Sequence, residues 1–279
     1  MGSVIEVTPK SLRDAFLKGE GFSKFQNSNI LQIEEIRDFF EKDSPYIDLV
    51  EFEKDIALIC ELVILFCESP GSFTELGCFS MIDEIYEKIL VIVQNHYLSQ
   101  STFISQGPVA NFKRTYDKSV YAIVDSGIGI INGDISTVNS KKLVDTVSPP
   151  ISSRLTETLG RTTLDISKFN HLCKIYVALV KEFYCLKDDD LLLLFWELGF
   201  DIDNKKLDRV AFCCRALKWA ASTTVGFDRV HYALGGTNEA AKFEFRNPLS
   251  DKIRRRLELR QFWEVADPDR VAAVSQELS

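Results

Sequence analysis

The stretch Ile56–Cys67 reads IALICELVILFC and is the longest nearly uncharged run in the chain, interrupted only by Glu61. Twelve residues make about 18 Å of helix, which is too short for the ~30 Å hydrocarbon core of a bilayer. The run therefore predicts no membrane span. It predicts instead a buried central helix, the second half of a long helix from Pro45 to about Glu68, with Leu62 and Phe66 in the core.

Helical spacing of apolar residues dominates the rest of the chain. Further helices are expected at residues 81–98, 108–125, 163–186, 191–198 and 203–221. Three helix starts share a capping side chain followed by proline: Thr8-Pro9, Ser44-Pro45 and Asp267-Pro268. The capping oxygen accepts a hydrogen bond from a free N–H, and proline lacks the N–H that would go unpaired. Ser69-Pro70-Gly71 is interpreted instead as the stop of the long helix.

One segment departs from the helical pattern. Ile128–Val138 reads IGIINGDISTV, and Asn132-Gly133 between β-branched runs predicts a short β-hairpin, because both turn positions need positive φ. Val138–Ile151 contains Ser148-Pro149-Pro150 and is the predicted hinge. The expected fold class is mainly α, with two helical lobes joined near this hairpin. The lobes are an acidic one at 1–127 and a neutral-to-basic one at 151–279, with the hairpin and hinge at 128–150.

Composition and charge narrow the function classes. The chain has 279 residues, 46% apolar and 27% charged, which excludes a disordered or fibrous protein. Its net charge is −8, divided between −10 over residues 1–100 and +2 over residues 101–279. A protein built wholly for nucleic-acid binding is usually basic overall. Opposite charges on two parts of one chain also permit self-association.

Cysteine usage indicates a reducing compartment. The seven cysteines are odd in number, lie mostly in apolar stretches and include no C-x-x-C pair. Residues 1–20 are polar and amphipathic without an apolar run, so no signal peptide is expected. We therefore expect reduced core cysteines, no metal site and a cytoplasmic protein.

Catalytic motifs are absent from the sequence. The only histidines are His96, His171 and His231, and none lies in a recognised catalytic context. Gly127–Gly133 lacks the strand before it and the helix after it that a dinucleotide loop requires, so these glycines are interpreted as turn-forming. Asp203 and Asp188 are interpreted as helix-start acids. No catalytic residue and no cofactor is predicted, and His231, near Gly235-Gly236, is the one remaining enzyme candidate.

Cationic segments are the candidate binding residues. Phosphates attract cations and unstacked bases attract aromatic rings, so a mixture of the two suits single-stranded nucleic acid. The candidates form four groups: Lys252, Arg255, Arg256 and Arg260; Lys205, Lys206 and Arg209; Lys242, Phe243, Phe245 and Arg246; and Lys113 with Arg114. A solvated helix face is the alternative, since Arg254–Glu258 and Arg260–Glu264 are spaced as i, i+4 pairs.

These observations favour a non-enzymatic helical binding or scaffold protein that acts through protein–protein contacts, including contacts with itself. One alternative is a single-stranded RNA-binding protein that polymerises, such as a viral nucleoprotein or a filament coat protein. The other is an enzyme centred on His231.

Overall fold

The chain forms two compact units. The computed structural model describes residues 9–21, 24–25, 28–40, 44–158, 163–235, 241, 243 and 251–279, without the side chains of 20, 21 and 37–40. The first unit contains residues 1–30 and 60–162, and the second contains residues 31–59 and 163–279. We call them the parallel unit and the antiparallel unit, after their sheets. The predicted boundaries at 127 and 150 differ from this division.

The prediction of a mainly α fold is wrong, because each unit contains a three-stranded sheet. In the parallel unit, β1 (Val63–Cys67), β2 (Ile89–Gln94) and β3 (Val120–Ile123) lie in the order β1-β2-β3, all parallel. Val63 pairs with Ile89, and Val91 pairs with Val120. The fold is therefore mixed α/β.

The apolar run Ile56–Cys67 contains the end of a helix and the start of this sheet. Helix α4 (Leu49–Ile59) ends inside the run, and β1 begins four residues later. A continuous apolar run does not distinguish a buried helix from a buried strand. The same ambiguity misled the helix prediction at 81–98, where β2 is buried at every residue. A central parallel strand is covered on both faces and so lacks alternation.

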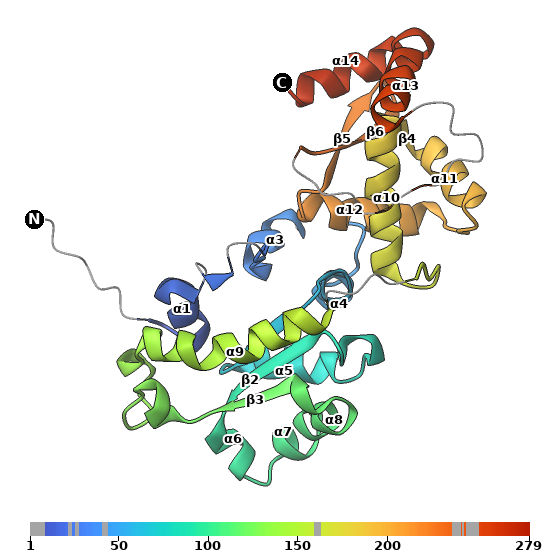
Figure 1. Ribbon diagram of the computed structural model, residues 1–279. Coiled ribbons are helices and arrows are strands. Elements are labelled where there is room, and N and C mark those ends of the chain that lie inside the picture. The colour runs from blue at the N-terminus through green and yellow to red at the C-terminus, as the bar shows by residue number, and fades with distance from the viewer. Residues whose placement is uncertain are drawn as a thin grey trace, which may run out of the picture. The chain divides into compact units, whose positions relative to one another are not determined.

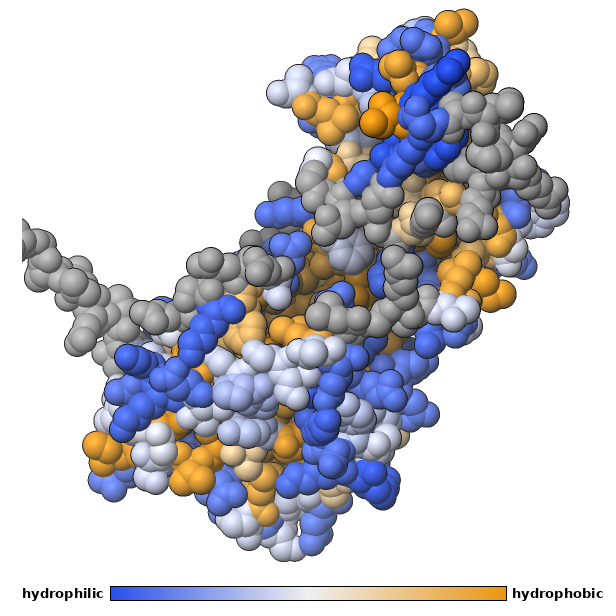
Figure 2. Space-filling view, viewed as in Figure 1, coloured by the Kyte–Doolittle hydropathy of each residue, from blue (hydrophilic) through white to orange (hydrophobic). Residues whose placement is uncertain are grey.

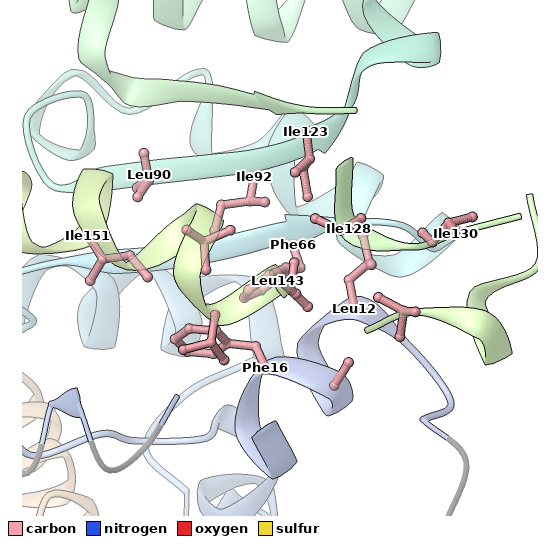
Figure 3. Packing of buried hydrophobic residues seen from close by; sticks show 14 residues of the cluster. Leu12, Phe16, Phe66, Leu90, Ile92, Ile123, Ile128, Ile130, Leu143 and Ile151 are labelled. Carbon is pink, nitrogen blue, oxygen red and sulfur yellow. The ribbon is translucent and has the colours of Figure 1, made fainter. Parts of the chain in front are cut away.

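Helices cover both faces of the parallel sheet (Figure 1). They are α1 (Leu12–Phe16, continued by a π-helical turn, Leu17–Gly21), α5 (Pro70–Phe79), α6 (Asn95–Ser99), α7 (Phe103–Gln106), α8 (Pro108–Thr115) and α9 (Ser140–Thr158). Leu90 and Ile92 of β2 belong to one buried apolar cluster with Leu143 of α9 and Phe16 of α1 (Figure 3). Their neighbours Ile89 and Val91 take the opposite face, as the alternation along a strand requires.

The predicted hairpin at 128–138 reduces to a tight turn. Asn132 and Gly133 have φ of 53° and 76°, as expected for such a turn. Only the single bridge Ile131–Asp134 forms, because the flanking residues make 3₁₀ turns, Asp125–Ile128 and Ile135–Thr137. The segment predicted as the hinge is helical instead: α9 runs through Pro149 and Pro150, and its apolar face is buried in the core.

The antiparallel unit is built around the buried helix α10 (Phe169–Phe183). Its other elements are α3 (Ile33–Phe40), α4, β4 (Leu186–Lys187), α11 (Asp188–Glu197), α12 (Asn204–Ala216), β5 (Ala220–Val225), β6 (Asp228–Ala233), α13 (Lys252–Ala266) and α14 (Pro268–Glu277). The strand order is β4-β6-β5, all antiparallel. Val271 and Val274 of α14 pack against Val230 and Tyr232 of β6.

The order α10, β4, α11, α12, β5, β6 is the order of elements in a helix-turn-helix followed by a β-hairpin wing. Local signals position it as predicted: Gly199, with φ of 87°, ends α11, and Asp203 caps α12 by accepting a hydrogen bond from the Lys206 N–H at 2.8 Å. Asp267 likewise caps α14 ahead of Pro268. In the part of the chain that the structure describes, no helix is long and apolar enough to cross a membrane.

Candidate functional site

The helix-turn-helix carries cations at both ends of α12. Lys205 lies exposed in the first turn, and Lys218 lies exposed just after the last turn. Arg215, in the last turn, has its guanidinium 5.3 Å from the ring centroid of Phe212. Among the described residues, no carboxylate forms an ion pair with these three side chains. Within the described part of the chain, the charges of these three side chains therefore have no acidic partner.

Arg209, in the middle of α12, is used internally. Its Nη1 donates to Glu51 of α4 at 2.6 Å, and its Nη2 donates to Asp55 of α4 at 2.6 Å. Asp55 is buried and also accepts a hydrogen bond from the Tyr46 hydroxyl at 2.9 Å. Lys206 stacks over the ring of Phe169 at 5.1 Å. Of the predicted group Lys205, Lys206 and Arg209, Lys205 is thus the fully exposed member.

A cleft of about 530 Å³ separates α12 from the wing. Asp208 and Arg215 line it from α12, and Ser222, Thr224 and Arg229 line it from β5 and β6. Arg229 is held by Asp188 at 3.0 Å and by Asp208 at 2.5 Å. Two cations line the cleft: Arg229 is paired, and Arg215 has no acidic partner among the described residues.

His231, the enzyme candidate, lies on β6 beside this cleft and has no exposed surface. Its Nδ1 is 2.8 Å from the Tyr176 hydroxyl, and its Nε2 is 2.6 Å from Asp188 Oδ1. Burial lowers the pKa of His231, and the hydrogen bond that its Nε2–H donates to Asp188 only partly offsets this. These contacts tie β6 to α10 and α11, and they occupy both nitrogens of the buried imidazole.

The predicted stripe on α13 is largely tied to α10. Arg255 Nε and Arg256 Nε donate to the two carboxylate oxygens of the buried Glu182, at 2.6 Å and 2.9 Å. Arg260 pairs with Glu264 at 3.3 Å, and Lys252 is half-buried at the start of the helix. Figure 2 shows charged and apolar residues interleaved on the surface of α13 and α14, at the upper end of that view. A role for this stripe in binding stays a prediction.

The two remaining predicted groups lie elsewhere. Lys242, Phe245 and Arg246 are outside the described residues, and Phe243 is half-buried. Lys113 and Arg114 are exposed on α8 of the parallel unit. Arg114 donates to its neighbour Asn111 at 2.7 Å.

A second constellation lies at the carboxyl edge of the parallel sheet. Ser69 follows β1, Gln94 ends β2, and Asp125 follows β3. Gln94 Nε2 donates to Asp125 Oδ1 at 2.9 Å, and His96 Nδ1 lies 3.7 Å from Asp125 Oδ2. In open parallel sheets, ligands bind outside this edge of the strands. The edge is therefore a candidate site for a small molecule.

Helix α5 begins at this edge with a reciprocal cap. The Ser72 N–H donates to Ser69 Oγ at 3.2 Å, and the Ser69 N–H donates to Ser72 Oγ at 3.0 Å. Glu75 follows in the second turn. Burial raises the pKa of the Cys67 thiol to about 12, and the negative charges of Glu75 and Glu68 add to this shift. A carboxylate therefore lies close to the last residue of β1.

Sequence reasoning missed this edge because it missed the strands. A usable signal was present in Ser69-Pro70, a capping side chain followed by proline, which is the pattern that correctly predicts the start of α14 at Asp267-Pro268. We interpreted it as a helix stop. In the structure it starts α5, directly after a strand.

Comparison with known proteins assigns the chain to a family. The family model described as "STM3845 retron effector protein" matches residues 9–222. The chain belongs to this retron effector family. Its family membership supports an effector role and gives no specific support to a scaffold.

Two curated Escherichia coli proteins are similar to this retron effector over shorter stretches. One is the "Retron Ec86 putative ribosyltransferase/DNA-binding protein", 35% identical over 98 residues, which are 35% of the chain and 32% of the relative. The other is the Retron Ec73 protein of the same description, 28% identical over 69 residues, which are 25% of the chain and 22% of the relative. Each match spans a third or less of the relative's length.

Proposed function

We propose that the antiparallel unit of this retron effector binds DNA through α12 and the wing β5–β6. The observation that carries the proposal is the helix-turn-helix with its wing, since the second helix of this motif characteristically enters the major groove. Lys205, Arg215 and Lys218 supply cations along that helix. The names of the two relatives, which include DNA binding, support this proposal.

Charge localises the proposed contact. The chain is acidic overall, at −8, so attraction to phosphates has to come from a local surface. At α12 the acids Asp188 and Asp208 are occupied by Arg229, whereas Lys205 and Lys218 have no acidic partner among the described residues. The ends of α12 are therefore the part of this surface that attracts a phosphate backbone.

Charge reversal tests the proposal. The variant Lys205→Glu/Lys218→Glu should bind a labelled duplex at least tenfold more weakly in fluorescence anisotropy. The slope of the logarithm of its binding constant against the logarithm of the salt concentration should become shallower by about 0.9 for each phosphate contact that is lost. Lys141→Glu/Lys142→Glu on α9 changes the net charge equally and is the matched control. Equal losses in both variants, or none in either, would contradict a contact at α12, and tighter binding of a single-stranded RNA competitor would favour the RNA alternative.

A second function is supported by the edge of the parallel sheet. We propose that this edge binds a ribose-containing substrate and transfers its ribosyl group. Such a transfer breaks the C1′–N bond, and the base leaves with the electron pair and takes up a proton. A nucleophilic acceptor, which is water in hydrolysis, forms the new bond to C1′ and gives up a proton, while a carboxylate stabilises the positive charge that develops at C1′. Glu75 is the carboxylate best placed on α5, the α5 N-terminus suits a phosphate, and Phe73 pairs with Tyr97 at 4.9 Å beside it.

Base release tests this second function. Incubation with nucleosides and nucleotides should liberate free base, detected by liquid chromatography. Glu75→Gln should lower the rate by at least a hundredfold, with the fold unchanged by circular dichroism. Glu87→Gln, outside this edge, is the control. If Glu75→Gln leaves the rate of base release unchanged, the reaction does not depend on the carboxylate of α5.

A further inference from the structure

The wing ends in a tight turn that projects an aromatic ring. Strands β5 and β6 pair from Ala220–Ala233 out to Val225–Asp228, so Gly226 and Phe227 alone form the turn. Gly226 has φ of 62°, which suits the first position of a two-residue hairpin turn. Phe227 is 106% exposed, the highest value among the exposed large apolar side chains of the described residues.

Single exposed apolar residues are common on protein surfaces, so the setting of Phe227 matters. The ladder is complete up to the turn, and the adjacent Asp228 is fixed by an ion pair with Lys187 at 2.7 Å. That pair also neutralises the acid next to the ring. The ring is therefore held out on a short, hydrogen-bonded hairpin, which lowers the entropy lost when it binds something.

The cleft beside α12 reaches almost to this turn. Thr224 and Arg229, which line the cleft, face each other one rung before the last pair of the hairpin. Arg215, the cation of the cleft without an acidic partner among the described residues, lines it from α12. An available cation thus lines the cleft from α12, and an apolar ring lies in the turn that continues the β5–β6 wall of the same cleft.

We propose that Phe227 stacks on an unpaired base of DNA while Arg215 contacts the neighbouring phosphate backbone. An aromatic ring binds the face of any base, and apolar wedges of this kind separate bases where DNA-binding proteins bend the duplex. The proposal rests on the proposed DNA binding and sharpens it. The preferred ligand is DNA with a bulged or unpaired nucleotide, rather than a perfect duplex.

Two hairpin DNAs of matched sequence, one fully paired and one with a single bulged nucleotide, test the proposal by fluorescence anisotropy. The wild type should bind the bulged DNA about tenfold more tightly. Phe227→Ala should bind both DNAs with the affinity of the wild type for the paired one. Phe227→Tyr keeps a stacking ring and should keep the preference. Because Phe227 makes no core contact, the unfolding transition of Phe227→Ala should coincide with that of the wild type.

The outcomes separate this proposal from the proposed function. Equal affinity of the wild type for both DNAs overturns base stacking but leaves DNA binding standing, whereas no binding to either DNA overturns both. A preference that survives in Phe227→Ala also overturns the role of the ring. If Phe227→Ala instead lowers the mass of the protein in solution without changing DNA affinity, the ring is a contact between protein copies and the proposal fails.

Discussion

The two units bury different kinds of side chain. Among the described residues of the parallel unit, Arg154 is the only charged side chain that is buried, and its core is otherwise dominated by leucine, isoleucine, valine and phenylalanine. The described part of the antiparallel unit buries five acidic or basic side chains: Asp55, His171, Glu182, His231 and Arg270. The first unit is therefore stabilised mainly by apolar area, and the second depends in addition on completed ion pairs and hydrogen bonds.

This difference determines what should damage each unit. Apolar burial depends on volume and contact, so truncation of a large side chain is the damaging change. A buried ion pair contributes little net stability, but removal of one partner leaves an uncompensated charge in the interior. The predictions below probe this contrast, from the largest expected effect to the smallest.

Arg209→Ala should be the most damaging change, because it leaves the buried Asp55 with the Tyr46 hydroxyl as its remaining partner. We expect the free energy of unfolding of the antiparallel unit to fall by about 3–5 kcal/mol. Trp196, Trp219 and Trp263 all lie in this unit, so tryptophan fluorescence in guanidinium reports on it. Lys205→Ala on the same helix is the control, and its free energy of unfolding should stay within ~0.5 kcal/mol of the wild type. A loss below ~1 kcal/mol for Arg209→Ala would contradict its internal role.

Leu90→Ala should be the corresponding change in the parallel unit, because Leu90 is buried on the central strand. The lost burial and the cavity should cost about 2–5 kcal/mol. Hydrogen exchange of peptides that cover β1, β2 and β3 measures this locally. Met81→Ala, at an exposed position of the same unit, should leave the exchange unchanged. Similar exchange in both variants would mean that the core tolerates the loss and that the contrast between the units is weaker than we infer.

Gly133→Ala should lower the free energy of unfolding by less, because its cost comes from the backbone conformation alone. A Cβ at Gly133 would meet open space, but its φ of 76° is unfavourable for any L side chain. We expect a cost of about 1–2 kcal/mol from that conformation. A Cβ at Gly127 also meets open space, and its φ is not in the left-handed region, so Gly127→Ala is the matched control. Thermal unfolding followed by circular dichroism should separate the two variants, and identical midpoints would argue against the turn.

The smallest expected effect is a pH dependence of the stability of the antiparallel unit. Burial holds the pKa of His231 below the usual value of about 6.5. As the pH falls through that value, the unfolded chain binds a proton that the folded chain does not, so stability is lost on acidification. The tryptophan-detected midpoint in guanidinium should therefore be lower at pH 5 than at pH 7. His231→Gln should reduce this difference, and an unchanged pH dependence would assign it to other groups, such as the buried His171.

Only part of the candidate site was predictable from the sequence. Lys205 was singled out and is exposed at the start of α12, and the cap at Asp203 that positions this helix was also predicted. Arg209 was grouped with Lys205 by spacing, yet it turns inward. Its partners Glu51 and Asp55 are more than 150 residues away in the chain, and no local pattern identifies them.

The two turns also show that local sequence does not by itself predict a hairpin. Asn132-Gly133 adopts the positive φ values that its residue types favour, but it makes no hairpin, because its flanks pack as 3₁₀ turns. The hairpin that does form turns at Gly226-Phe227, where the sequence signal is weaker and where pairing with β4 supports the strands. An isolated two-stranded ribbon is marginal without such support.

The sequence by itself determined the features that depend on neighbours in the chain: the caps at Asp203 and Asp267, the stop at Gly199 and the positive φ of Gly133. These rest on hydrogen bonds and steric limits within a few residues. The tertiary structure decided whether an apolar run became helix or strand, since Val63–Cys67 is a strand only because β2 pairs with it. It also decided which cations face solvent, because the carboxylates that neutralise Arg209, Arg255 and Arg256 come from distant segments that only folding brings near.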